Sequence, residues 1–428
     1  MEYGLIGEKL GHSFSKEVHN RLFDYDYTLK EIAREDLDAF MTARDFRAIN
    51  VTIPYKQDVI PYLHKIDDNA EKIGAVNTVV NKGGKLYGYN TDFLGLLALI
   101  EKNGIELEGK KVLILGSGGT SKTAFAVAEH KNAREILRVS RTAREGGITY
   151  EDAYKYHSDA QIIINTTPCG MYPNIGESPI DIDKFDCLSG MVDAIYNPLD
   201  TALIVAAKRR GIKATGGLYM LVAQAAFAAE LFLDTKLDFG TIDEVYNAIY
   251  QSKRNIVLIG MPGSGKTTVG KLLADSLGRE FIDTDERIKS HERCEIADIF
   301  ARVGEKGFRD IESQIIKQVA SVSGAVIATG GGAVLREQNV NLLRGNSKIY
   351  FIDRPLEQIT ATPDRPLSSN REALEARYRE RYPIYCAAAD IKIDNLSDAQ
   401  EAAEKIAKSF RICEYFNKAT ALNPYPKI

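Results

Sequence analysis

The feature that most constrains the fold is a pair of glycine-rich turns, each placed between a short apolar run and a helical pattern. Val112–Leu115 leads into the turn Gly116–Ser121, and Val257–Ile259 leads into the turn Gly260–Thr267. The order of strand, glycine-rich loop and helix is typical of a nucleotide-binding βα unit, in which N–H groups at the helix N-terminus face phosphate. The two turns lie about 144 residues apart, which is the length of one domain. The chain is therefore predicted to hold two nucleotide-binding units.

Apolar runs alternate with helical patterns through most of the chain, which predicts an α/β fold with parallel sheets. The 428 residues are 44% hydrophobic and 27% charged, an ordinary globular balance. The net charge of −4 argues against nucleic acid or an anionic membrane as a partner. The five cysteines form no CxxC pair, which argues against disulfides or a zinc cluster. With no signal peptide recognised, we expect a cytoplasmic protein.

A polar stretch, residues 251–254, separates the helical pattern that ends at Tyr250 from the apolar run that starts at Asn255. Such a stretch predicts a short linker between two units, each long enough to fold alone.

The second turn, Gly260–Thr267, matches the pattern GxxxxGK followed by Ser or Thr at every fixed position. Its glycines let the backbone wrap a β-phosphate, Lys266 reaches the β- and γ-phosphates, and the Thr267 hydroxyl binds Mg²⁺. The cofactors predicted here are ATP and Mg²⁺. The residues expected to bind them are Gly260, Gly263, Ser264, Gly265, Lys266, Thr267 and Thr268.

Two carboxylates, Asp283 and Asp285, follow the apolar residues Phe281 and Ile282. Alternate residues at a strand end point the same way, so both acids can face the phosphate loop. One would hold Mg²⁺ through water and the other would meet the acceptor hydroxyl. Two solvated acids at a turn fit the same spacing.

Four further segments complete an ordered set with the phosphate loop: Gly304–Glu312, Ala328–Gly332, Asp364–Leu367 and Arg381–Tyr385. The set resembles shikimate kinase over residues 255–410, leaving 411–428 as a tail. The resemblance implies that Asp285, Arg309 and Arg381 hold shikimate, the arginines gripping its carboxylate. The other implied residues are Gly330, Gly331 and Gly332 against the ring, Asp283 for the metal, and Lys266 and Arg365 beside Asp285 for catalysis.

The family often has a basic residue near the adenine, in the stretch before the lid that contains Arg365. Residues 359–362 of this chain contain none.

The first turn, Gly116–Ser121, follows GxGxxG except for serine at the sixth position. About 20 residues beyond the glycines, the run Ile136–Val139 ends in Ser140, Arg141 and Thr142. An acid there would select the free 2′-hydroxyl of NAD, whereas these donors and the positive charge favour the 2′-phosphate of NADP. An exposed arginine without a ligand is the alternative. The expected cofactor-binding residues are Gly116, Gly118, Gly119, Thr120, Ser140, Arg141, Thr142 and Gly217.

Ordered segments on both sides of this loop are similar to shikimate dehydrogenase over residues 1–250: Gly11–Ser15, Asn50–Lys56, Gly74–Thr78, Gly88–Asp92, Asn165–Met171, Asp193–Pro198 and Gly217–Gln224. The resemblance implies a substrate domain (1–89 plus 218–250) around a Rossmann-like NADP domain (90–217). Lys56 would give a proton to a ketone oxygen, with Asp92 orienting it. The implied substrate-binding residues are Ser13, Ser15, Thr52, Asn77, Tyr196 and Gln224.

The two resemblances predict one bifunctional enzyme of the shikimate pathway, whose partners are small-molecule substrates. It would reduce 3-dehydroshikimate with NADPH and then phosphorylate the shikimate with ATP. One alternative is a quinate/shikimate dehydrogenase using NAD, fused to the same kinase. Another is a metabolite sensor without catalysis, but such paralogues usually lose the lysine or aspartate that does the chemistry. Here Lys56, Asp92, Lys266, Asp283 and Asp285 are all present.

Overall fold

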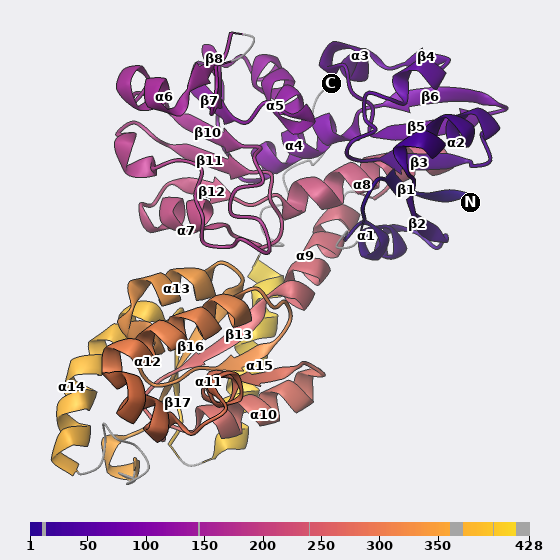
Figure 1. The fold of residues 1–428 in the computed structure, drawn as a ribbon. Coiled ribbons are helices and arrows are strands. Elements are labelled where there is room, and N and C mark those ends of the chain that lie inside the picture. Colours follow the sequence, from indigo (N-terminus) through magenta and orange to yellow (C-terminus); the bar gives the residue numbers. More distant parts are fainter. Residues whose placement is uncertain (11–13, 144–145, 239, 360–370, 397, 417–428) are drawn as a thin grey trace.

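The computed structural model describes residues 1–10, 14–143, 146–238, 240–359, 371–396 and 398–416, with side chains described as far as residue 411. Three sheets follow one another along these residues (Figure 1). Two predicted site residues, Ser13 and Arg365, lie outside the described residues. Every helix in the described ranges is too short or too polar to cross a membrane.

The first sheet is mixed, whereas the sequence predicts parallel sheets. In sheet order, its strands are β2 (Tyr27–Glu31), β1 (Tyr3–Gly7), β3 (Ala48–Val51), β5 (Thr78–Lys82), β6 (Lys85–Tyr89) and β4 (Lys65–Ile66). β5 runs antiparallel to both β3 and β6. The antiparallel pair of β5 and β6 follows from the turn at Gly83 and Gly84, whose positive φ values of 61° and 81° allow a tight hairpin. The accompanying helices are α1 (Ser15–Leu22), α2 (Leu37–Ala43) and α3 (Asp68–Ile73).

The second sheet has the predicted parallel arrangement throughout. In sheet order, its strands are β12 (Lys213–Thr215), β11 (Gly190–Asp193), β10 (Ile162–Asn165), β7 (Lys111–Leu115), β8 (Glu135–Ser140) and β9 (Ile148–Thr149). The central strands β7, β10 and β11 are buried along their whole length, as expected for a sheet covered on both faces. The neighbouring helices are α4 (Thr91–Lys102), α5 (Gly119–His130), α6 (Tyr150–Tyr156) and α7 (Ala202–Arg209).

Two helices, α8 (Leu218–Leu233) and α9 (Thr241–Lys253), return the chain from the second sheet to the first. α8 packs closely on α4, because a Cβ placed on Gly95 would lie only 2.7 Å from the Met220 carbonyl oxygen. α8 takes part in two apolar clusters, one with β7, β10 and β11 of the second sheet and one, through Ala228 and Phe232, with β1, β2, β3 and β5 of the first sheet.

The third sheet is also parallel. In sheet order, its strands are β14 (Phe281–Asp283), β15 (Val326–Ala328), β13 (Asn255–Ile259), β16 (Ser347–Asp353) and β17 (Ile391–Asp394). Apolar clusters line both of its faces. The surrounding helices are α10 (Lys266–Leu277), α11 (Thr284–Glu292), α12 (Ile296–Ala320), the 3₁₀ turn η4 (Ala333–Leu335), α13 (Glu337–Arg344), α14 (Arg371–Ala388) and α15 (Ala399–Phe416). α15 continues past residue 410, where the sequence places the start of the tail.

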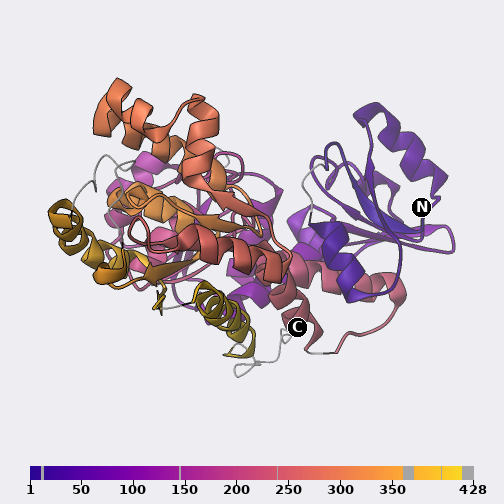
Figure 2. The same cartoon turned by 90° about the horizontal axis from the view of Figure 1, so that it is seen from below.

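The predicted linker is not a separate segment. Residues 251–253 form the last turn of α9, and only Arg254 separates that helix from β13. The stretch holds no proline or glycine to stop a helix, and Arg279 donates hydrogen bonds to the carbonyl oxygens of Gln251 (2.7 Å) and Arg254 (2.6 Å). Viewed from below, the third-sheet unit lies against the second-sheet unit, and the first-sheet unit stands to one side (Figure 2).

Candidate functional site

A lysine and an aspartate form a close ion pair where the first sheet meets α4. Lys56 follows β3, and Asp92 lies in the first turn of α4, which Asn90 caps by accepting a hydrogen bond from the Phe93 N–H. Lys56 Nζ lies 2.6 Å from Asp92 Oδ2, and the side chains are 20% and 14% exposed. Partial burial makes the charges interact strongly while leaving Lys56 accessible from one side.

Neutral polar side chains gather beside this pair. Asn77 Nδ2 donates to Thr91 Oγ1 (3.0 Å) and to Gln224 Oε1 (3.4 Å), and the Thr91 N–H donates to Asn77 Oδ1 (2.7 Å). The structure therefore brings together Asn77 and Gln224, which are 147 residues apart in sequence. Thr91 also belongs to this polar group. The sequence does not single it out as a site residue, although it adjoins Asp92.

The remaining predicted substrate residues lie on separate elements. Ser15 begins α1 and is buried, and Thr52 follows β3, its N–H donating to the Ile6 carbonyl. Tyr196 follows β11, and its ring lies 5.2 Å from the ring of Phe14. Burial raises the pKa of Tyr196 above its ordinary value, so the phenol stays protonated.

The first glycine-rich turn has open space where a diphosphate would lie. Gly116 has a φ of 112°, and a Cβ on it would lie 2.7 Å from Thr166 Oγ1. Gly118 and Gly119, at the N-terminus of α5, have no neighbour within 4 Å of an added Cβ. The departure at the sixth position is accommodated, because the buried Ser121 Oγ donates a 2.8 Å hydrogen bond to the Gly116 carbonyl.

The end of β8 lies next to this turn, since the Gly116 N–H donates to the Val139 carbonyl at 2.8 Å. Ser140 Oγ donates to the Thr142 carbonyl (2.7 Å), and Arg141 is exposed with no described acid paired to it. Gly217 differs from the rest of the predicted set. A Cβ there would lie 2.2 Å from the Ala194 carbonyl oxygen, so close packing is sufficient to require glycine.

The second turn wraps the ammonium of its lysine. Gly260, Gly263 and Gly265 all have positive φ, and Lys266 Nζ donates to the carbonyl oxygens of Gly260 (3.0 Å) and Met261 (2.9 Å). The other predicted members are Ser264, whose buried Oγ has no hydrogen-bond partner among the described residues, and the exposed Thr267 and Thr268 on the first turn of α10. An unpaired buried hydroxyl in such a loop fits a phosphate ligand.

The two carboxylates beside this turn lie on different elements, not on one strand as predicted. β14 ends at Asp283, which becomes the N-cap of α11 by accepting from the Asp285 N–H (3.0 Å). Asp283 Oδ2 also accepts from Thr267 Oγ1 at 2.8 Å, which fits a shared metal. Burial raises the pKa of Asp285 to about 6, and the charge of Asp283 adds to the rise.

Three of the predicted side chains meet at the three glycines that follow β15. A Cβ on Gly330 would lie 2.5 Å from Asp285 Oδ1, and Arg381 Nη1 donates to the Gly331 carbonyl at 3.2 Å. Arg309 lies against Gly332. Both arginines are buried, yet the Nε of each has no hydrogen-bond partner in the part of the chain that the structure describes. Unpaired buried guanidinium N–H groups fit an anionic ligand, above all a carboxylate.

Three residues near these groups carry no role predicted from the sequence, although one of them, Glu312, ends the segment Gly304–Glu312. Glu312, almost fully buried, accepts from Arg309 Nη1 at 2.7 Å. Arg354 follows β16, with its Nη1 4.0 Å from a Cβ placed on Gly265 and its buried Nε unpaired. Asn395 donates to the Ser264 carbonyl at 2.8 Å. The position of Arg354 in the sequence does indicate a ligand-binding residue, because it directly follows the apolar run of β16. Ligands bind at the carboxyl ends of the strands of a parallel sheet.

Comparisons with known proteins agree with both halves of this geometry. Residues 262–411 match the family model for shikimate kinase, and residues 5–79 match that for the shikimate dehydrogenase substrate binding domain. Shikimate dehydrogenase (NADP(+)) of Clostridium beijerinckii is 38% identical over 253 residues, which cover 55% of this chain and 93% of that protein.

Solved structures are similar over the same region. A chorismate mutase/shikimate 5-dehydrogenase fusion protein from Clostridium acetobutylicum matches with a TM-score of 0.55 and 38% identity, over 58% of this chain and 96% of that chain. Shikimate 5-dehydrogenase from Thermus thermophilus, in complex with NADP(H) and shikimate, matches with a TM-score of 0.52 and 27% identity, over 58% and 99%. The chain therefore belongs to the shikimate dehydrogenase family and continues into a shikimate kinase domain, so that one polypeptide carries two enzymes of the shikimate pathway.

Proposed function

We propose that the N-terminal part reduces 3-dehydroshikimate to shikimate with NADPH, and that the kinase domain phosphorylates shikimate to shikimate 3-phosphate with ATP and Mg²⁺. NADPH supplies the hydride and ATP the phosphoryl group. The remaining work of binding, orientation and proton transfer belongs to side chains of this chain.

In the reduction, Lys56 is the proton donor and Asp92 holds it in place. Negative charge develops on the ketone oxygen as the carbonyl carbon is reduced, so an ammonium within reach of that oxygen stabilises the transition state and then protonates it. The 2.6 Å contact with Asp92 orients the Lys56 ammonium. Asn77, Gln224, Thr52, Ser15, Ser13 and Tyr196 are the proposed partners of the substrate's hydroxyls and carboxylate.

Arg141 is the residue that favours NADP over NAD. It lies at the end of β8 beside Gly116 and has no described acidic partner, so its guanidinium is available to a 2′-phosphate. Gly118 and Gly119 leave room for the diphosphate at the N-terminus of α5. The NADP in the names of the relatives supports this choice over the NAD-dependent quinate/shikimate alternative.

In the kinase domain, Arg309 and Arg381 bind the shikimate carboxylate through their unpaired N–H groups. Asp285 meets the 3-hydroxyl, and the backbone at Gly330–Gly332 lies against the ring. Lys266 and the loop around it hold the phosphates, while Thr267 and Asp283 hold Mg²⁺. We place Arg354 at the nucleotide, where it supplies the positive charge that residues 359–362 do not.

The observation that carries the proposal is the Lys56–Asp92 pair, because a non-catalytic sensor has no need of a half-buried ammonium beside a group of neutral polar side chains. The test follows NADPH absorbance with 3-dehydroshikimate, then adds ATP and Mg²⁺ and looks for shikimate 3-phosphate. Parallel reactions with NADH and with quinate in the oxidative direction separate the alternatives. Loss of NADPH without phosphorylation would limit the proposal to the first reaction. Binding of both substrates without turnover would favour the sensor.

A further inference from the structure

One loop connects the predicted cofactor site to the kinase domain. We call it the bridging loop (residues 166–180), and it follows β10 directly. At its start, Thr166 Oγ1 donates to the Leu115 carbonyl (2.6 Å) and lies where a Cβ on Gly116 would touch it. The N–H of Thr167 donates to Asn165 Oδ1 at 3.0 Å. The beginning of the loop is therefore fixed against the first glycine of the dinucleotide turn.

The middle of the bridging loop is anchored in the kinase domain. Ile175 is only 4% exposed and belongs to the apolar cluster formed by β13, β16, α12 and α13. The next residue, Gly176, has a φ of 90°, and a Cβ on it would lie 2.7 Å from Leu342 Cδ2. Only glycine allows the loop to approach α13 this closely, so the contact is built into both partners.

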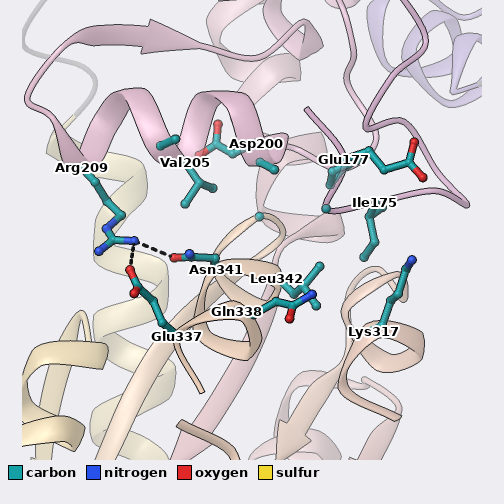
Figure 3. Close-up of a pocket in the computed structure, with 15 residues that line it drawn as sticks. Ile175, Glu177, Asp200, Val205, Arg209, Lys317, Glu337, Gln338, Asn341 and Leu342 are labelled. Atoms are coloured by element: carbon teal, nitrogen blue, oxygen red, sulfur yellow. Dashed lines mark hydrogen bonds and ion pairs between the residues drawn. The ribbon is translucent and has the colours of Figure 1, made fainter. Parts of the chain in front are cut away.

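A second contact joins α7 to α13 (Figure 3). Arg209 Nη1 lies 2.5 Å from Glu337 Oε1 and donates to Asn341 Oδ1 at 3.2 Å. The Asp200 N–H donates to the Gly345 carbonyl at 2.8 Å, and residues of both contacts line a cavity of about 580 Å³. Ile175 and Gly176 of the bridging loop line the same cavity, so the loop and α7 meet the kinase domain around one site.

Buried hydrogen bonds continue from this interface to the sheet edge that carries the dinucleotide turn. Thr201, next to Asp200, caps α7 and donates to Asp193 Oδ2 at 2.7 Å. Asn165 Nδ2 donates to Asp193 Oδ1 at 3.0 Å. Asn165 and Asp193 end the adjacent strands β10 and β11, and Asn165 also fixes the start of the bridging loop.

We propose that the kinase domain positions the bridging loop, so that tight binding of NADPH by the dehydrogenase requires the contact of Ile175 and Gly176 with the kinase. Ile175 and Leu342 are positioning residues in this scheme, because they act through the loop and do not touch the cofactor. The inference rests on the proposed function in that it takes the dinucleotide turn as the NADPH site.

The sharpest test changes only the kinase side. In the full chain, Leu342→Ala is expected to raise the KM for NADPH about five- to tenfold while changing kcat less than twofold. The matched control is Leu343→Ala, at the next position of α13, where the side chain is fully buried within the kinase core. The control should lower stability but leave the KM for NADPH unchanged. An unchanged KM in Leu342→Ala, or an equal rise in Leu343→Ala, would overturn the inference.

The second test approaches the same contact from the loop. Ile175→Ala should raise the KM for NADPH as Leu342→Ala does, and the double variant should raise it no further, because both remove one contact. Ile182→Ala is the control, since Ile182 is equally buried but packs only within the second-sheet unit. Multiplying effects in the double variant would contradict a shared contact. A wild-type chain that does not oxidise NADPH would instead refute the proposed function.

Discussion

A Cβ placed on Gly332 would lie 2.1 Å from Nη1 of Arg309, so the guanidinium occupies the space that any other residue at this position would fill. Gly332→Ala must therefore displace Arg309 and break its hydrogen bond with Glu312. We expect the KM for shikimate to rise about tenfold or more, since a charge-assisted contact is lost, with the KM for ATP little changed. Gly240→Ala, at an open position before α9, is the control. A normal KM for shikimate in Gly332→Ala would show that Arg309 does not bind the substrate.

Lys56→Ala should lower the kcat of the dehydrogenase by about 10²–10⁴-fold, because proton donation is needed mainly in the transition state. The KM for the substrate should change much less. Steady-state rates at several substrate concentrations measure both. The exposed Lys65 provides a control in the same unit, and the kinase activity of the same preparation reports on folding. A near-normal kcat would remove Lys56 from the mechanism.

Arg141→Ala should weaken the binding of NADPH far more than that of NADH, because only NADPH carries the 2′-phosphate. Loss of a charge-assisted contact predicts a rise in the KM for NADPH of about ten- to a hundredfold. The ratio of the two KM values is the measurement, and the exposed Arg134 is the control. Equal changes for both cofactors would contradict the assignment of Arg141 to the phosphate.

In the kinase assay, Arg354→Gln and Arg309→Lys should each raise the KM for a different substrate. The first removes a charge beside Gly265 and should raise the KM for ATP, with the KM for shikimate kept within about twofold. The second keeps the charge but loses the planar fork that matches a carboxylate, so it should raise the KM for shikimate instead. If Arg354→Gln affected shikimate alone, the guanidinium would belong to the acceptor site.

Asp193 provides a pH-dependent prediction for stability. Burial raises the pKa of Asp193 from 3.8 to about 6, so the native chain holds its proton more tightly than the unfolded chain does. The protonated Asp193 therefore contributes its full share to the free energy of unfolding below about pH 4. This contribution is lost as the pH rises to about 6. Relative to Asp193→Asn, wild-type unfolding free energy should fall by roughly 2–3 kcal/mol over this interval and then stay level. Urea unfolding of both full chains at pH 4 to 7 measures the difference. A difference that does not vary with pH would show that Asp193 ionises normally.

The sequence predicts the fold most accurately at segments whose structure depends on a few consecutive residues. Both glycine turns lie between the expected strand and helix, because phosphate-binding loops need glycines at fixed spacing wherever they occur. Polarity alone is a weaker guide to the structure of a segment. The polar residues 251–254 predict a linker, yet the carbonyl groups at the end of α9 accept hydrogen bonds from Arg279, which is distant in sequence. Likewise, the spacing of Asp283 and Asp285 fits a strand, but the cap formed by Asp283 starts a helix between them.

Residues that become neighbours only through the fold could not be found in this way. Arg354 belongs to none of the motif segments and becomes visible only when Gly265 from another element lies against it. Glu312 ends the segment Gly304–Glu312 and pairs with Arg309 on the same helix, α12, but its approach to Gly330 comes only from the fold. The lid residue Arg365 and the first predicted serine, Ser13, lie outside the described residues and stay predictions. The roles of the other site residues also stay predictions, although the structure brings the Lys56, Asn77 and Gln224 groups close together.

The return of α8 to the first sheet has a consequence for synthesis of the chain. The strands of that sheet all precede residue 90, but α8, most of whose residues are buried, is made only after the whole second sheet. Of the two dehydrogenase sheets, the one that leaves the ribosome earlier is thus the later one to gain its apolar cover. With only Arg254 between α9 and β13, the central strand of the kinase sheet emerges almost as soon as that cover is complete.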